Sequence, residues 1–142
     1  MDRMLIYRLQ DANNNGPYSI ICGNNVGLKN ELSAIRQKLN RPYKLNDGSE
    51  RYMHPDADTG TPLARAFFDK LIYRGSPYVF GFATLEHLYI WYAKEEINVF
   101  EKYGFNIYEY NIPDDKVISG SRQVIFKLCD TIQYNKIIHP NL

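Results

Sequence analysis

Apolar and polar side chains alternate in several short stretches of the chain, which is the pattern of strands with a buried face. The first stretch, Met4 to Leu9, places Leu5, Tyr7 and Leu9 on one face and Ile6 and Arg8 on the other. Alternation and β-favouring residues predict further strands at 18–22, 78–82, 105–110, 123–128 and 136–139.

Apolar residues recur at helical spacing in three other stretches. The first predicted helix ends near residue 40 and has a stripe formed by Leu28, Leu32, Ile35 and Leu39. The second begins at Thr61, with Pro62 at the first helical position, and ends at Gly75.

The third predicted helix is one continuous element over residues 84–103. Thr84 is its expected N-cap, and Gly104 is the expected left-handed residue after its last turn. Its buried stripe is formed by Leu85, Leu88, Tyr92 and Val99.

The order of these elements predicts an α+β fold: a single compact domain over residues 1–142, mostly antiparallel sheet with about three helices. Residues 41–61 are rich in Pro, Asp, Gly and Asn and lack periodicity, so we expect a long loop there.

Composition excludes several classes of protein. With 44% hydrophobic and 23% charged residues the chain is globular, and its net charge of +1 excludes nucleic-acid binding by charge excess. No apolar run is long enough for a membrane span, and the N-terminus lacks a signal-peptide pattern, so we expect a cytoplasmic protein. Two cysteines, Cys22 and Cys129, are too few for a disulfide framework.

The commonest residues indicate where the gene comes from. The chain has 13 Asn, 14 Ile and 12 Tyr against 7 Ala, and the first three have AT-rich codons. This favours an AT-rich genome, either of a bacteriophage or of an AT-rich bacterium.

Candidate chemistry is sparse. His54, Asp56 and Asp58 lie within one loop and offer oxygen ligands to a hard cation, but a solvated loop is the favoured explanation. No Cys or His pair has zinc-ligand spacing. We therefore expect no metal. Among the 20 aromatic residues, Tyr7 beside Arg8 and Phe82 beside Gly81 are candidates for stacking on a ligand.

One pattern resembles the ADP-ribosyltransferase superfamily. Tyr7-Arg8 lies on an early strand, and residues 78–84 form a strand that runs into a helix containing Trp91-Tyr92-Ala93. Residues 120–126 are similar to the late strand that carries the family's catalytic Glu.

The resemblance implies a cleft for NAD, used as substrate. Arg8 would contact a phosphate or ribose, Gly81 would admit the ligand, Tyr7 or Phe82 would stack on nicotinamide, and Thr84 would orient a ribose. The position that matches the catalytic Glu is Gln123, which supplies no charge to an oxocarbenium-like transition state. Another carboxylate, such as Glu109 on the neighbouring strand, is the alternative for that role.

Two functions follow as alternatives. One is a small phage-type protein that binds NAD or ADP-ribose, with Arg8 and Gln123 as its catalytic residues, and transfers ADP-ribose to a host target. In that case Arg8→Ala should barely change stability, because a ligand-binding Arg is not needed for packing. The other is a non-enzymatic protein that binds and inhibits a host or bacterial-defence component. The sequence leaves the oligomeric state open.

Overall fold

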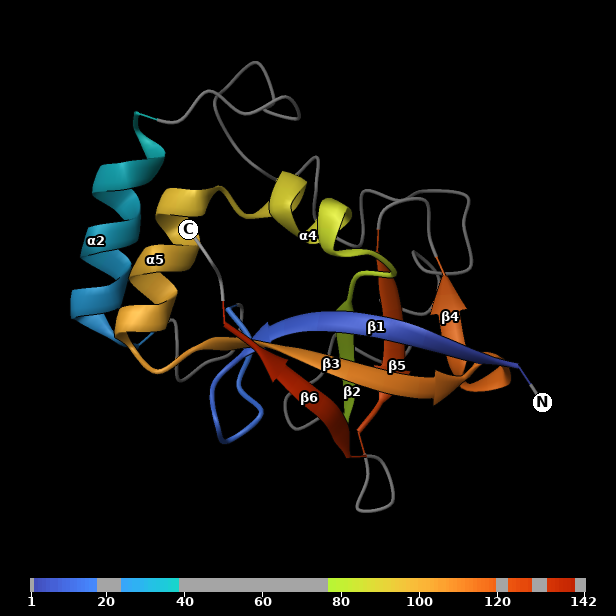
Figure 1. Cartoon of the computed structure of the whole chain (residues 1–142). Coiled ribbons are helices and arrows are strands. Elements are labelled where there is room, and N and C mark those ends of the chain that lie inside the picture. The colour runs from blue at the N-terminus through green and yellow to red at the C-terminus, as the bar shows by residue number, and fades with distance from the viewer. Residues whose placement is uncertain (1, 18–23, 39–76, 120–122, 129–132, 140–142) are drawn as a thin grey trace.

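The fold was determined as a computed structural model that describes residues 2–17, 24–38, 77–119, 123–128 and 133–139. Within these ranges the chain forms three α-helices and two three-stranded antiparallel sheets (Figure 1). This confirms the predicted α+β class. The predicted strand at 18–22, the loop at 41–61 and the helix at 61–75 lie outside the described residues.

The first sheet has the order β1-β3-β6, formed by β1 (Arg3–Gln10), β3 (Asn106–Pro113) and β6 (Tyr134–Ile138). β1 pairs with β3 along its whole length, with Tyr7 opposite Glu109 and Arg8 opposite Tyr108. β6 pairs with the other edge of β3, and the register shifts between Glu109 and Tyr110. Such a bulge changes the direction of the side chains beside it.

The second sheet has the order β2-β5-β4, formed by β2 (Tyr78–Gly81), β5 (Val124–Lys127) and β4 (Val117–Ser119). A 3-10 turn at Asp114–Lys116 connects β3 to β4. The strands of this sheet run across those of the first (Figure 1). The two sheets are joined by a bridge between Tyr7 and Phe82, whose backbone groups exchange two hydrogen bonds of 2.8 Å.

β1 and β3 separate two apolar clusters, because alternate residues of a strand point to opposite faces. Leu9 and Ile107 belong to the cluster that contains the buried residues of the helices. Ile6, Tyr108 and Tyr110 belong to the cluster that also contains residues of β5, between the sheets. Apolar side chains therefore pack on both faces of β1 and β3.

The helix predicted for residues 84–103 is two helices, α4 (Leu85–Trp91) and α5 (Lys94–Lys102), so the prediction of one continuous helix is wrong. Tyr92 and Ala93 between them have extended backbones. The adjacent side chains of Trp91 and Tyr92 at this break are both buried, in one group of rings with Phe82.

The predicted ends of this segment are confirmed. The Thr84 side chain accepts a hydrogen bond from the His87 amide as N-cap of α4. Gly104 has a φ of 91° after α5, and the Phe105 amide donates to the Phe100 carbonyl at 3.0 Å. The rings of Phe100 and Phe105 are also in contact, which completes a Schellman motif.

The helix predicted around Leu28 is α2 (Val26–Arg36), which packs against α5 (Figure 1). Asn25 caps it by accepting a hydrogen bond from the Leu28 amide at 3.1 Å. In the part of the chain that the structure describes, no helix is long and apolar enough to cross a membrane.

Candidate functional site

The residues selected from the sequence meet at one place in the fold. Tyr7 and Arg8 lie on β1 where the end of β2 approaches it, and Gly81 and Phe82 form that end. Gln123 immediately precedes Val124, the β5 residue opposite Gly81. The sequence therefore selected neighbours in space, although the contacts of each side chain decide what it does.

The Arg8 guanidinium is enclosed and used as a hydrogen-bond donor inside the protein. Its Nη1 donates to the Phe80 carbonyl at 2.9 Å, its Nη2 to the Asn14 carbonyl at 3.2 Å and its Nε to Gln10 Oε1 at 3.1 Å. Arg8 is only 5% exposed and lies over the Phe80 ring. These contacts connect β1, β2 and the loop after β1.

Further polar groups complete this buried network. The Tyr110 hydroxyl donates to Gln10 Oε1 at 2.8 Å, and Gln10 Nε2 donates to Asn14 Oδ1 at 2.9 Å. Burial of Arg8 lowers the pKa of its guanidinium to about 10, so the group stays charged at neutral pH. Gly16 lies against this group, since a Cβ there would stand 2.7 Å from Arg8 Nη2.

Gly81 and Phe82 are packing residues at the junction of the sheets. A Cβ on Gly81 would lie 2.7 Å from Ile6 Cγ2 and 2.9 Å from the Tyr7 carbonyl oxygen. The glycine thus admits the backbone of β1, and close approach of another backbone is one of the reasons for a glycine inside a strand. Phe82 is 1% exposed and contacts the rings of Trp91 and Tyr92.

Thr84 and Gln123 are the remaining two candidates. Thr84 caps α4 through its hydroxyl oxygen. Gln123 is buried, with 2% of its surface exposed.

A second polar cluster lies on the opposite face of the first sheet from Arg8. Glu109 is 4% exposed and accepts a hydrogen bond from Asn135 Nδ2 at 2.6 Å, and Lys136 Nζ lies 3.9 Å from its other oxygen. Tyr7 stands opposite Glu109, and burial together with the hydrogen bond to Glu109 raises the pKa of the Tyr7 phenol. We call Tyr7, Glu109, Asn135 and Lys136 the Glu109 cluster.

This arrangement separates two residues that the sequence interpretation combined. Arg8 and Glu109 point to opposite faces of the sheet, so the Glu109 carboxylate does not lie beside the Arg8 guanidinium. The sequence analysis missed Asn135 and Lys136, because their approach to Glu109 depends on the bulge in β6 pairing, which no local pattern indicates.

No group of three or more potential metal ligands occurs among the residues that the structure describes. His54, Asp56 and Asp58 lie outside those residues.

Comparisons with known proteins bear on the origin of the chain. The family model described as "Bacteriophage T4 Y00F protein" matches residues 4–138. A relative from Enterobacteria phage T4, the "uncharacterized 19.7 kDa protein in motB-dexA intergenic region", is 38% identical over 50 residues, and the match covers 35% of this chain and 30% of that protein. No solved structure matches the chain. Of the two AT-rich sources, these findings support a phage, and the chain belongs to the bacteriophage T4 Y00F family.

Proposed function

We propose that this phage-type protein is a non-enzymatic binding protein that acts on a host protein in the cytoplasm of the infected bacterium. The family supports the setting, and the side-chain contacts support binding rather than catalysis. The observation that carries the proposal is a pair of exposed apolar side chains, Tyr89 and Ile90, next to each other on α4.

Tyr89 and Ile90 are 39% and 37% exposed, whereas their neighbours Leu88 and Trp91 are almost completely buried. The buried side chains and the Thr84 cap fix α4 on the protein, so the exposed pair is held on a rigid support. Tyrosine is enriched among the residues that dominate protein–protein binding energy, and rigid presentation reduces the entropy lost on binding.

The residues that would form an NAD cleft are an indirect argument for the non-enzymatic binding function. The described contacts of Arg8 are with Phe80, Asn14 and Gln10, and a phosphate would have to replace them. A guanidinium that already satisfies buried carbonyls contributes to the fold, and breaking those bonds would offset the gain from a ligand.

Affinity capture from host lysate tests the proposal. The wild-type chain is compared with a Tyr89→Ser/Ile90→Ser variant, and Glu86→Ser, an exposed substitution on the same helix, is the matched control. We expect wild-type and Glu86→Ser proteins to retain the same host protein and the double variant to lose it. Equal recovery by all three would contradict a role for this face.

A second candidate function is the binding of NAD or ADP-ribose, with transfer of ADP-ribose to a host protein. It is favoured by one observation: the Glu109 cluster holds a carboxylate beside Tyr7. On this hypothesis NAD raises the melting temperature of the wild-type chain, as a native-state ligand must, and Glu109→Gln abolishes the increase. The proposed binding function predicts no change in melting temperature with NAD for either protein.

A further inference from the structure

Helix α2 is attached to the rest of the described structure along one side. Leu28 and Leu32 are its buried residues, and Val26 is 69% exposed. Its close neighbour is α5, and the two helices lie side by side (Figure 1). Leu28 and Leu32 belong to the same apolar cluster as Ile97 and Phe100 of α5. The α2–α5 contact is therefore a narrow apolar seam.

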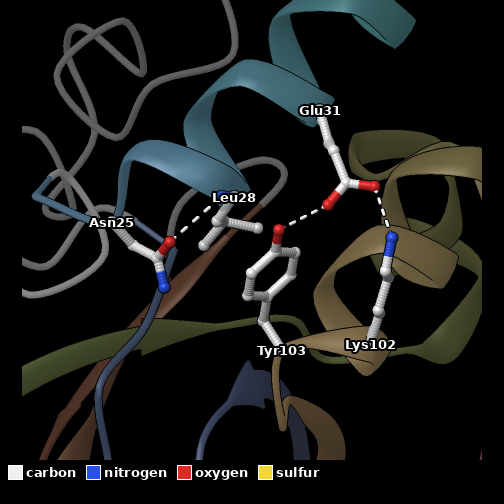
Figure 2. Close-up of polar contacts among 5 residues, drawn as sticks. All are labelled: Asn25, Leu28, Glu31, Lys102 and Tyr103. Carbon is white, nitrogen blue, oxygen red and sulfur yellow. Dashed lines mark hydrogen bonds and ion pairs between the residues drawn. The ribbon is translucent and has the colours of Figure 1, made fainter.

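Polar side chains hold this seam at two places. At the middle of α2, Glu31 accepts hydrogen bonds from Lys102 Nζ at 2.7 Å and from the Tyr103 hydroxyl (Figure 2). Near its end, Arg36 Nε donates to Glu96 Oε2 at 2.8 Å. We call Glu31, Lys102 and Tyr103 the Glu31 clasp.

The two polar contacts differ in their environment. Glu96 is completely buried and also accepts a hydrogen bond from the Ala93 amide at the start of α5. The Glu31 and Lys102 side chains are 35% and 65% exposed. Water can therefore replace the partners in the Glu31 clasp at low cost, whereas the Glu96 carboxylate is needed to cap α5.

Gly27 makes room for the clasp. A Cβ at this position would stand 2.8 Å from the Tyr103 hydroxyl oxygen. Alanine is favoured over glycine within a helix, so a glycine in α2 is a cost that the approach of Tyr103 explains.

From this geometry we propose that α2 opens as a separate unit, controlled by the Glu31 clasp, and thereby uncovers the apolar seam of α5 while the sheets stay folded. The inference does not depend on the proposed binding function. It assigns α2 to the low-stability part of the fold, because its attachment is narrow and one of its two polar contacts is made by solvent-accessible groups.

Native-state hydrogen exchange on the full chain tests this. Amides of α2 should exchange faster than those of β3 in the wild-type protein. Glu31→Gln should accelerate exchange in α2 by about three- to tenfold and leave β3 unchanged, since it weakens one partly exposed charged contact. Glu101→Gln, an exposed substitution on α5 outside the clasp, is the control and should change neither element. Equal exchange in α2 and β3, or equal acceleration of both, would overturn the proposal.

Glu31→Gln removes a charge as well as the clasp. A second comparison tests the clasp without changing any charge. Gly27→Ala should accelerate exchange in α2, because its methyl group displaces the Tyr103 hydroxyl from Glu31. In a Tyr103→Phe background the hydroxyl is absent, and the same substitution should slow exchange in α2, since only the helix propensity then changes. If Gly27→Ala slows exchange in both backgrounds, the clasp does not control α2.

Discussion

Arg8 brings a full positive charge to the point where β1, β2 and the loop after β1 meet. Its described partners are two backbone carbonyls and the Gln10 amide oxygen, so several buried acceptors depend on one side chain. A sequence in which Arg follows Tyr on a strand also fits a ligand-binding role. A structural Arg and a ligand-binding Arg differ only in what surrounds the guanidinium. Here the surroundings are set by Phe80 on β2 and by Asn14 in the loop after β1.

We therefore expect Arg8→Ala to lower the free energy of unfolding by about 1–3 kcal/mol, because buried acceptors lose their donors. This reverses the sequence-based expectation of a small effect. Chemical denaturation measures the change, and Arg3→Ala is the control: Arg3 is exposed and bonds only Asn111 among the described residues. A loss no larger than that of Arg3→Ala would mean that Arg8 is held for a ligand.

Gly81 gives a second prediction at the same scale. Gly81→Ala should destabilise the protein by about 1–3 kcal/mol, since the new methyl group meets the rigid Tyr7 carbonyl as well as Ile6. Thermal or urea denaturation measures it. Unchanged stability would show that β1 and β2 separate easily, contrary to the bridge between Tyr7 and Phe82.

At the scale of elements, local chemistry predicted the ends of helices better than their interiors. Thr84 has the hydroxyl that an N-cap requires, and Gly104 lacks the side chain that a positive φ disfavours. The sequence predicts both helix ends. The break at Tyr92–Ala93 involves neither Gly nor Pro. The rings of Trp91 and Tyr92 at the break pack with Phe82, a contact that no local signal in the sequence indicates.

The candidate site shows the same division between what local sequence predicts and what long-range packing decides. The sequence analysis grouped Tyr7, Arg8, Gly81 and Phe82 through a family resemblance, and in the structure they lie at one junction of β1 and β2. It did not reveal that Glu109 faces away from Arg8, or that Asn135 reaches Glu109, because both depend on the register between strands distant in sequence.

The Glu31 clasp predicts that α2 is most stable over a limited range of pH. Hydrogen bonds from Lys102 and Tyr103 lower the pKa of Glu31 below its ordinary value of 4.5, so its contribution is present above 4.5 and is lost as the pH falls through the folded-state value. The bond to Glu31 raises the pKa of Lys102 above 10.5, so that contribution is lost as the pH rises through the folded-state value.

Exchange protection factors, which correct for the intrinsic pH dependence of exchange, measure this window in α2. We expect protection to decline toward both extremes in the wild-type chain, and the acid decline to shrink in Glu31→Gln. An identical acid decline in the two proteins would assign the effect to another carboxylate.

At the scale of the whole molecule, the two crossed sheets and three helices of the described residues are organised around β3. β1 covers one edge of β3, β6 covers the other, and β1 also carries the bridge to Phe82 (Figure 1). β3 therefore pairs with strands from both ends of the described chain. Both apolar clusters contain β3 residues, so the two halves of the core share this strand.

The pairing of β1 with β3 also constrains how the protein is made. Gln10 pairs with Asn106 and Arg3 with Pro113, which are separated by about a hundred residues, so β1 leaves the ribosome long before its partner. Until then the strand has an unpaired edge and an exposed Ile6, the features that make nascent chains aggregate. We expect ribosome-bound chains to stay protease-sensitive at β1 until β3 has emerged from the exit tunnel, and pulse proteolysis of stalled chains of increasing length would measure this. Protection at shorter lengths would mean that β1 first pairs with β2 through Phe82.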